Sequence, residues 1–265
     1  MAVLRMVALG SSFAAGPGIE PVVDRAAGRS GRNYAHLVAT HLGASLVDAT
    51  VSGATTETVL RARQRVGLRT FPPQIELVTA DADLVTVTAG GNDVGYLGGV
   101  VMTALLGQLG RCRLTSPVSS FARGRRVLRP VTPQQKESAN EGLVSIVTGI
   151  RERAPRARVV LVDYLPVFSD SSTPGASMPL TTNEIAHFRE VASDLSAILA
   201  EASSRTGCDL VPASSLEPDH GAGSAAPWVN GLSLRRLASS FHPNVAGMQA
   251  VADRVVTLLA AGGSP

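Results

Sequence analysis

ALGSSFAAG, the segment from Ala8 to Gly16, begins at the end of a short, mostly apolar run, Val3–Leu9. A mostly apolar run before a turn rich in small residues predicts a buried strand at the start of the chain. Ser12 then lies just past the carboxyl end of that strand. A serine in this place either caps a following helix or is presented at the sheet edge as a nucleophile. The second interpretation requires a base and oxyanion donors from the rest of the sequence.

Strand-like and helix-like patterns alternate along the remainder of the chain. LVTVT, Leu84–Thr88, is rich in β-branched residues, and RVVLV, Arg158–Val162, is a similar apolar run. Strands that alternate with helices at this spacing predict a parallel sheet covered by helices on both faces, and therefore an α/β fold. Further strands are expected at 45–48 and 209–211, and helices at 34–42, 75–79, 133–153, 183–204 and 243–261.

Length and composition fit one domain with long loops. The chain has 265 residues, and 45% of them are hydrophobic, which is enough for a sizeable core. Three segments rich in Gly, Pro and Ser interrupt the regular alternation: 110–131, 164–180 and 213–240. Functional residues of open parallel sheets gather at the carboxyl ends of the strands. We therefore expect a single domain over residues 1–265, with these loops crossing its active edge.

The charge pattern argues against a nucleic-acid partner. The net charge is only +3, and the arginines are dispersed apart from a patch between Arg111 and Arg129. No run of about 18 apolar residues occurs, so the sequence predicts no stable membrane insertion. No signal peptide is visible before Ala8, which leaves either a cytoplasmic protein or a secreted one whose leader was removed. We expect a monomer.

Neither the cysteines nor the histidines indicate a metal site or a cofactor. Their spacing matches neither HExxH nor CxxC, two patterns typical of metal ligands. Two cysteines, Cys112 and Cys208, are too few for a disulfide framework, and they either pair with each other or stay reduced.

Three further motifs place polar groups after other predicted elements. VSGATT, Val51–Thr56, follows the second strand and offers the backbone N–H of Gly53. AGGNDVGY, Ala89–Tyr96, follows the third and presents the amide of Asn92. FHPN places His242 at the mouth of the last helix. Taken one at a time, these residues also fit a turn glycine, a helix-capping asparagine and a surface histidine.

Together, the four motifs contain the groups that acyl transfer needs. A serine hydroxyl is a poor nucleophile until a base within hydrogen-bond reach takes its proton. Histidine suits this role because its pKa lies near the working pH. The oxyanion formed by the attack then needs preorganised donors, such as backbone N–H groups and an asparagine amide.

In their order along the chain, GSSFAAG, Gly53, GGND and FHPN resemble the sequence blocks of the SGNH hydrolases, also called GDSL esterases. The resemblance spans residues 10–247 and is greatest to secreted-type esterases of actinobacteria and fungi. PWVNG, Pro227–Gly231, also resembles a stretch that precedes the histidine in those esterases. The resemblance implies a flavodoxin-like three-layer α/β/α sandwich with a five-stranded parallel sheet.

The same resemblance implies a function and a set of site residues. Ser12 would be the nucleophile and His242 its base. The N–H groups of Ser12 and Gly53, with the amide of Asn92, would form the oxyanion hole. The implied reaction is hydrolysis of a small-molecule or lipid ester through an acyl-enzyme, without a metal or cofactor.

The chain departs from the family pattern at two positions. Ser11 stands where the family usually has an Asp before the nucleophile, which implies an altered hydrogen bond there. Ser239 stands where the family usually has the Asp of the catalytic triad, three residues before the histidine. We therefore predict a dyad of Ser12 and His242, oriented by a main-chain carbonyl.

The resemblance favours the carbonyl of Trp228 for that role. Some relatives that lack the Asp are thought to use the carbonyl of a Trp in the stretch before the histidine, and Trp228 matches that position. Two alternatives stay open at this point: the Ser239 hydroxyl, or Asp219 from the preceding loop.

Other functions fit the motifs less well. Gly-rich turns after strands also bind phosphates, but GSSFAAGPG has neither the GxGxxG order nor a GK[ST] ending. The nucleophile elbow of α/β-hydrolases follows several strands, whereas Ser12 follows the first. An acetyl-carbohydrate esterase, an acyltransferase and a non-catalytic binding module on the same fold are the remaining alternatives.

Overall fold

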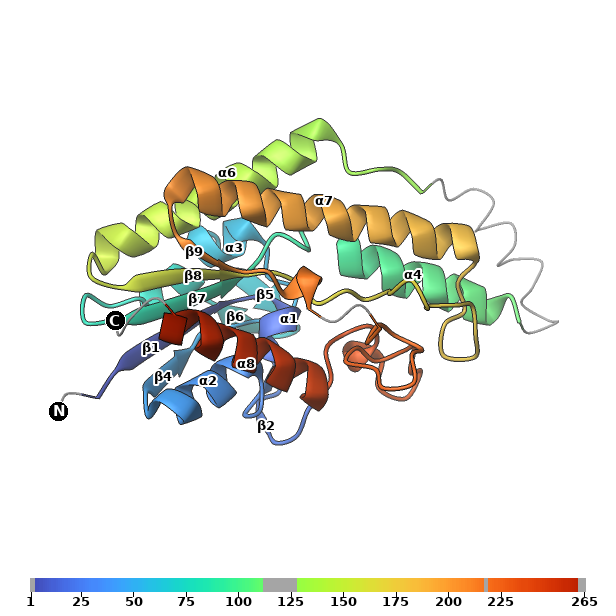
Figure 1. Ribbon diagram of the computed structural model, residues 1–265, viewed down its shortest axis with the longest axis horizontal. Helices are drawn as coiled ribbons and strands as arrows, with labels where there is room; N and C mark the ends of the chain where they lie inside the picture. The colour runs from blue at the N-terminus through green and yellow to red at the C-terminus, as the bar shows by residue number, and fades with distance from the viewer. Residues whose placement is uncertain (1–2, 112–127, 217–218, 262–265) are drawn as a thin grey trace.

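The computed structural model describes residues 3–111, 128–216 and 219–261. At its centre lies a five-stranded parallel sheet with the strand order β4-β1-β7-β8-β9 (Figure 1). When these five strands are renumbered 1 to 5 by their order along the chain, their order across the sheet is 2-1-3-4-5. This is the strand order of flavodoxin-like folds. The predicted α/β fold with a five-stranded parallel sheet is confirmed. The strands are β1 (Arg5–Gly10), β4 (Ser45–Asp48), β7 (Leu84–Thr88), β8 (Arg158–Val162) and β9 (Asp209–Val211).

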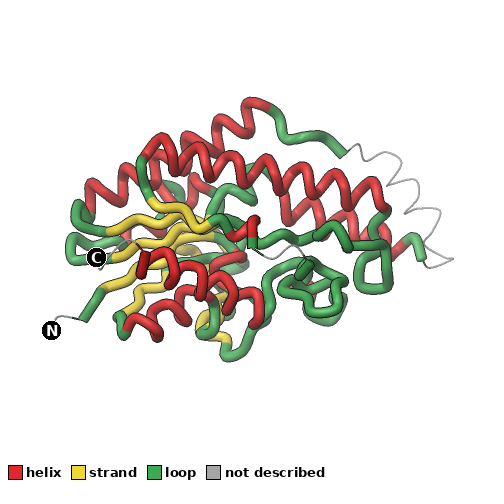
Figure 2. The backbone as a smooth tube through the Cα atoms, in the orientation of Figure 1, coloured by secondary structure: helices red, strands yellow, loops and turns green. Residues whose placement is uncertain are grey.

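Helices cover both faces of the sheet and complete the three layers (Figures 1 and 2). One layer contains α2 (Tyr34–Leu42) and α8 (Val245–Ala261), which pack against each other. The other contains α6 (Pro133–Arg153) and α7 (Thr182–Thr206), together with α3 (Thr56–Leu60) and α4 (Tyr96–Leu109). No helix in the described ranges combines the length and the apolarity needed to cross a membrane.

The inner strands form where the sequence is rich in apolar and β-branched residues. β7 is buried at every position, and β1 and β8 are buried at every position after their first residue. A parallel strand with helices on both faces has no side exposed to water, so its residues read as a continuous apolar run.

The bounds of several elements differ slightly from the predicted ones. β1 begins at Arg5 instead of residue 3, and the last helix begins at Val245 instead of residue 243. Asn244 caps that helix, because its side-chain oxygen accepts a hydrogen bond from the N–H of Gly247 at 3.0 Å. The short helix expected at 75–79 is a 3-10 helix, η1 (Gln74–Leu77).

The loop regions contain elements too short for the sequence pattern to reveal. Two small hairpins pair β2 (Val22–Asp24) with β3 (Arg29–Ser30) and β5 (Gln64–Val66) with β6 (Arg69–Phe71). Segment 213–240 contains the short 3-10 helices η2 (Ala213–Ser215) and η3 (Leu237–Ser239). Most of the long loop expected at 110–131 lies outside the described residues, as does Cys112, whereas Cys208 is a buried free thiol.

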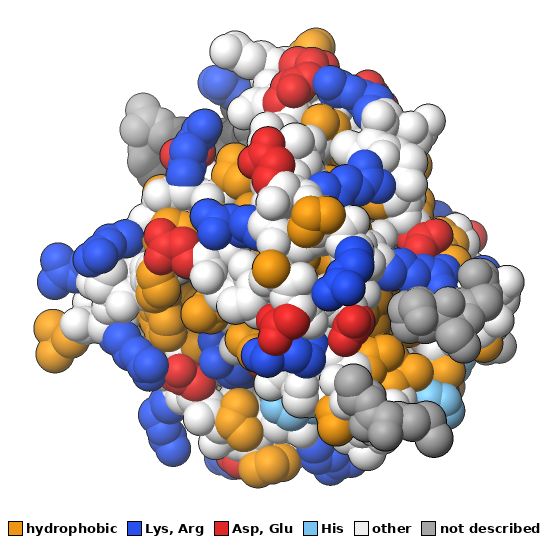
Figure 3. All heavy atoms as spheres, turned by 90° about the vertical axis from the view of Figure 1, so that its left-hand side faces the viewer, with side chains coloured by type: hydrophobic (Ala, Val, Ile, Leu, Met, Phe, Trp, Pro, Cys, Tyr) orange, Lys and Arg blue, Asp and Glu red, His pale blue; other side chains and the backbone are white. Residues whose placement is uncertain are grey.

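The end of the molecule from which the strands start carries a mixed charged surface. Figure 3 shows Lys and Arg side chains interspersed with Asp and Glu side chains on this face. Arg5, the first residue of β1, pairs with Asp81 at 2.5 Å. The charge of Arg5 on this face is therefore compensated locally.

The other end of β1 is held tightly against β7. Gly10 has a φ of 148°, and a Cβ atom there would lie only 2.5 Å from the carbonyl oxygen of Thr88. The side chain of Gln74 binds both backbone groups of Gly10, at 2.7 Å to its N–H and 3.0 Å to its carbonyl. Ser11 N–H donates to the Thr88 carbonyl at 2.9 Å. The backbone leading into Ser12 is thus fixed on both sides.

Replacing Gly10 by Ala is expected to destabilise the fold, because the new methyl group would overlap the Thr88 carbonyl. Overpacking of this kind typically costs about 1–3 kcal/mol of unfolding free energy. Urea denaturation followed by circular dichroism measures the change. Gly98→Ala in α4 is the matched control, since its Cβ would meet no atom within 4 Å. An unfolding free energy for Gly10→Ala equal to that of the control would contradict the prediction.

Candidate active site

Ser12 and His242 lie side by side, although 230 positions separate them in the sequence. The Nε2 atom of His242 is 2.7 Å from the Oγ atom of Ser12. Ser12 begins the short helix α1 (Ser12–Ala15) at the carboxyl end of β1, and His242 belongs to the loop before α8. Both side chains are largely buried. The structure therefore brings together the serine and the histidine singled out in the sequence.

The second ring nitrogen of His242 binds a carbonyl, but not the predicted one. Its Nδ1 atom is 2.8 Å from the carbonyl oxygen of Ser240. The carbonyl of Trp228 instead accepts a hydrogen bond from the N–H of Asn244 at 2.8 Å. It is engaged there because the chain around Val229 pairs in antiparallel fashion with the chain around Pro243. The expected Trp228 carbonyl is thus replaced by that of Ser240.

The two side-chain alternatives do not hold the ring either. Both ring nitrogens of His242 are occupied by the partners just described. The Ser239 hydroxyl donates to the carbonyl of Arg236 at 2.9 Å. Asp219 is exposed in the preceding loop. Within the described residues, the ring of His242 is therefore oriented by the main chain.

Burial keeps the His242 ring neutral at neutral pH. Desolvation lowers the pKa of His242 to about 4, and the hydrogen bond to the Ser240 carbonyl offsets this only in part. A carbonyl can only accept, so Nδ1 carries the proton and donates it to Ser240. The lone pair of Nε2 is then directed at the hydroxyl of Ser12.

The loop that carries the histidine is held in an uncommon backbone conformation. Phe241 has a φ of 57°, in the left-handed region that non-glycine residues rarely adopt. Its ring is fully buried, with its centroid 5.9 Å from that of Phe168. Asn230 accepts a hydrogen bond from the N–H of Phe241 at 3.2 Å and donates one from its side chain to the carbonyl of His242 at 3.2 Å. The surroundings thus impose this conformation, as expected of a functional loop.

A tyrosine hydroxyl links the loops after β1 and β7. The Oη atom of Tyr164 accepts a hydrogen bond from the N–H of Gly91 at 3.1 Å and lies 3.3 Å from the Oγ atom of Ser11. Tyr164 is buried, and its ring packs against Phe13 with the centroids 4.9 Å apart. The altered hydrogen bond expected at Ser11 is therefore one to Tyr164. The sequence placed this tyrosine in a loop but gave no sign of its partners.

Gly53 and Asn92 reach the same sheet edge, because they follow the two strands that flank β1. The side-chain amide of Asn92 donates to the carbonyl of Ala54 at 2.8 Å. The carboxylate of Asp93 accepts hydrogen bonds from the N–H and the hydroxyl of Thr56, at 3.1 and 2.5 Å. Gly53 has a φ of 82°, a conformation that favours glycine. The two loops are thus fastened to each other.

Three N–H donors remain available at this edge. Within the part of the chain that the structure describes, the backbone N–H groups of Ser12 and Gly53 make no hydrogen bond. The Asn92 amide carries a second hydrogen besides the one donated to Ala54. Donors of this kind stabilise negative charge on an oxygen atom.

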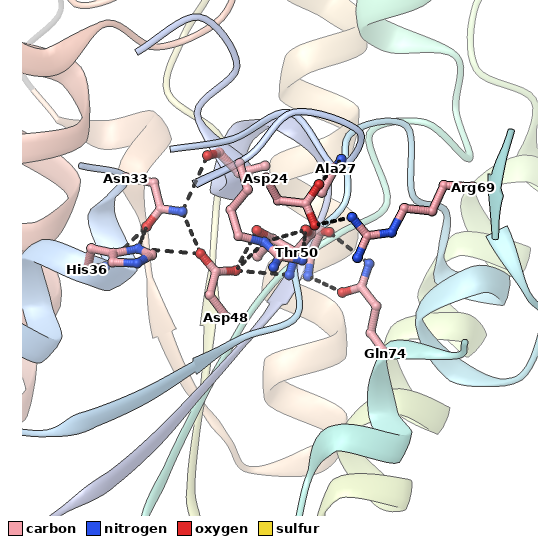
Figure 4. Close-up of polar contacts among 11 residues, drawn as sticks. Asp24, Ala27, Asn33, His36, Asp48, Thr50, Arg69 and Gln74 are labelled. Carbon is pink, nitrogen blue, oxygen red and sulfur yellow. Dashed lines mark hydrogen bonds and ion pairs between the residues drawn. The ribbon is translucent and has the colours of Figure 1, made fainter. Parts of the chain in front are cut away.

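A polar network supports the loop that contains Gly53 (Figure 4). Asp48, the last residue of β4, accepts hydrogen bonds from the N–H and the hydroxyl of Thr50, at 3.0 and 2.6 Å, and from the amide of Asn33 at 2.8 Å. Arg29 donates to the carbonyl of Thr50 at 2.7 Å. The start of the loop is therefore fixed before the chain reaches Gly53.

The site consists of a hydroxyl group, a neutral imidazole and free N–H donors. Together these groups can transfer a proton and stabilise an oxyanion, which is the requirement of acyl transfer. Among the described residues, no three His, Cys, Asp or Glu side chains gather in a way that could hold a metal ion.

Comparison with known proteins identifies the family to which the sequence is similar. The model of the GDSL-like lipase/acylhydrolase family matches residues 8–250. Lipase 2 of Streptomyces coelicolor is 29% identical over 266 residues, which cover 97% of this chain and 86% of that relative.

Solved structures share the fold over nearly the whole chain. The extracellular lipase of Streptomyces rimosus superposes with a TM-score of 0.72 at 24% identity, covering 96% of this chain and 99% of that one. Phospholipase A1 of Streptomyces albidoflavus gives a TM-score of 0.74 at 22% identity, covering 97% and 99%. At these identities, the structures show the likeness of the fold.

The titration of His242 tests the proposed cause of its neutrality. Because burial is the main cause, the ring is expected to titrate with a pKa of about 4 in the wild type and to stay well below 6.5 in Ser12→Ala. Ser239→Ala and Asp219→Asn should leave the pKa unchanged, since neither side chain binds the ring. NMR of the imidazole protons as a function of pH measures the pKa. A value near 6.5 in the wild type would refute this account.

Proposed function

Because the chain belongs to the GDSL-like lipase/acylhydrolase family and is a carboxylic ester hydrolase, we propose that Ser12 is its nucleophile and His242 its general base. The observation that carries the proposal is the distance of 2.7 Å between Ser12 Oγ and His242 Nε2. This distance allows the proton to pass directly from the hydroxyl group to the ring.

In the first half of the proposed reaction, Ser12 Oγ attacks the ester carbonyl carbon while its proton moves to Nε2 of His242. The C–O bond of the ester then breaks, and Nε2 returns the proton to the departing alcohol. An acyl group remains on Ser12. In the second half, a water molecule gives its proton to Nε2, attacks the acyl carbon and releases the carboxylic acid, and Ser12 regains its proton.

The proposed oxyanion hole is formed by the N–H groups of Ser12 and Gly53 and the free amide hydrogen of Asn92. The hydrogen bonds from Asn92 to Ala54 and from Thr56 to Asp93 support this role, because they fix the two loops before substrate arrives. Preorganised donors cost no reorganisation energy when the charge develops. Tyr164 positions the same loop through the N–H of Gly91.

We propose lipid esters as the substrate class. The relatives named as lipases and phospholipase A1 support this choice. The single Trp of the chain gives less support to a carbohydrate ester. The ring of Trp228 is stacked on His220, with the centroids 4.0 Å apart, so that one face is covered and cannot stack on a sugar.

Replacing Ser12 by Ala is expected to abolish hydrolysis of p-nitrophenyl esters, because no other hydroxyl group of the described residues is bonded to His242. Ser11→Ala is the matched control, and it should keep most of the activity because Ser11 faces Tyr164. A serine-directed phosphonate should label Ser12, as mass spectrometry of the labelled peptide would show. Labelling at another residue, or full activity of Ser12→Ala, would rule out the assignment.

Replacing Asn92 by Ala is expected to lower kcat by roughly a hundredfold to a thousandfold, the range seen for loss of one oxyanion donor. KM should change little, because the hydrogen bond forms mainly in the transition state. Steady-state kinetics with a p-nitrophenyl ester separates the two constants. A rise in KM at constant kcat would instead show that Asn92 only binds the substrate.

A further inference from the structure

An open cavity of about 580 Å³ adjoins the loop that carries His242. It lies between the chain that follows α1, around Gly18–Glu20, and the chain around residues 230–239. Its volume falls within the range of about 300–1,000 Å³ typical of small-molecule sites. Charged and polar side chains line much of it, among them Glu20, Arg32, Ser177, Asn230, Arg236 and Ser239.

The arginines of this cavity have no charged partner among the residues that the structure describes. Within those ranges, the guanidinium groups of Arg32 and Arg236 form neither a hydrogen bond nor an ion pair. Glu20 is the only acidic residue among the described residues of the lining, and its carboxylate accepts a hydrogen bond from the N–H of Val22 at 3.0 Å. Two guanidinium groups in one cavity suit an anion, because their planar donors match phosphate oxygens.

Apolar side chains also line part of the cavity. They belong to Ile19, Leu232 and Val245, of which Val245 is exposed. Apolar side chains around a basic cavity suit a ligand that has an acidic head and an apolar body.

One wall of the cavity is hydrogen-bonded to the loop that carries His242, although neither Ser12 nor His242 is itself a lining residue. The side chain of Asn230 binds the carbonyls of Ser239 and His242, both at 3.2 Å. Gly18 allows the opposite wall to close, because a Cβ atom there would lie 2.6 Å from the Cβ atom of Ser239. A group held in this cavity is therefore held beside the loop of the catalytic base.

We propose that this cavity binds the anionic phosphate group of the ester substrate, and that Arg32 and Arg236 determine the preference for such substrates. The inference rests on the proposed function, since it assigns a substrate class to the same site. The hydrocarbon part of the ligand would lie along Ile19, Leu232 and Val245, with the scissile ester at Ser12.

The test compares two esters that share the hexanoyl chain. Dihexanoyl phosphatidylglycerol, kept below its micellar concentration, carries the phosphate group, and p-nitrophenyl hexanoate does not. The measured quantity is the ratio of kcat/KM for the phosphate ester to kcat/KM for the neutral ester. In Arg32→Gln/Arg236→Gln this ratio should fall at least about tenfold relative to the wild type, which corresponds to the loss of about 1.4 kcal/mol of selective binding.

Arg235→Gln is the matched control, because Arg235 is exposed and adjacent to Arg236 but does not line the cavity. In this variant the ratio should stay within about twofold of the wild-type value. Circular dichroism and the urea midpoint establish that each variant is folded. An unchanged ratio in the double variant, or an equal fall in Arg235→Gln, would overturn the proposal.

Competition by glycerol 1-phosphate shows whether the cavity binds a phosphate group by itself or only the phosphate group of a lipid. Inhibition that weakens in the double variant shows that the cavity binds phosphate by itself. A fall in the ratio without such inhibition shows that it binds phosphate only as part of the lipid, and both results support the inference. A wild type that cleaves the neutral ester but not the phosphate ester would overturn it. Hydrolysis of neither ester would overturn the proposed function instead.

Discussion

The arrangement of the site depends on the parallel pairing of β1 with both β4 and β7. The register places Ala8 opposite Asp48 and Gly10 opposite Thr88, so that the three strands end at the same edge. The residues that continue from these ends are Ser12, Gly53 and Asn92. Neighbouring parallel strands cannot be joined by a tight turn. Ser12, Gly53 and Asn92 therefore meet although they are far apart in sequence. Their meeting requires β1 to lie close to β7, which the missing side chain of Gly10 allows.

The loops at this edge are connected mainly to one another. Tyr164 bridges Ser11 and Gly91, and Asn92 reaches across to the carbonyl of Ala54. Such cross-links hold donors in place at the cost of conformational freedom, which is the arrangement that electrostatic stabilisation of a transition state requires. The interactions that stabilise the fold at this edge are thus the same ones that would hold the reacting groups.

The elements that could be predicted from the sequence are those with a strong local signal. β7 and β8 are short runs dominated by Val and Leu, and α6 begins with a capping box at Thr132 followed by Pro133. The bounds of α4 could not be predicted. Its residues YLGGVVMTALLGQL are apolar on almost every side and include three glycines, so no polar face marks the helix. The short hairpins likewise have too few residues for a periodicity to emerge.

The same distinction holds for the site. Ser12, Gly53, Asn92 and His242 could be chosen because side-chain type and motif order identify them. The acceptor of the Nδ1 proton could not, because every residue has a carbonyl and only the backbone path shows which one faces the ring. Trp228 matched a pattern, but its carbonyl is taken up by Asn244. The hydroxyl of Tyr164 was equally hidden, since its two partners lie on different loops.

The use of the Ser240 carbonyl in place of a carboxylate changes the electrical character of the proposed catalytic centre. A serine–histidine–aspartate triad carries one negative charge at rest and keeps that net charge when the imidazolium and oxyanion form. The proposed dyad is neutral at rest, and proton transfer in the proposed reaction would create an ion pair whose two members are the imidazolium of His242 and the oxygen of the substrate. The counter-ion of the protonated ring is therefore supplied by the substrate itself. A dyad without a fixed carboxylate also offers no repulsion of its own to an incoming anion.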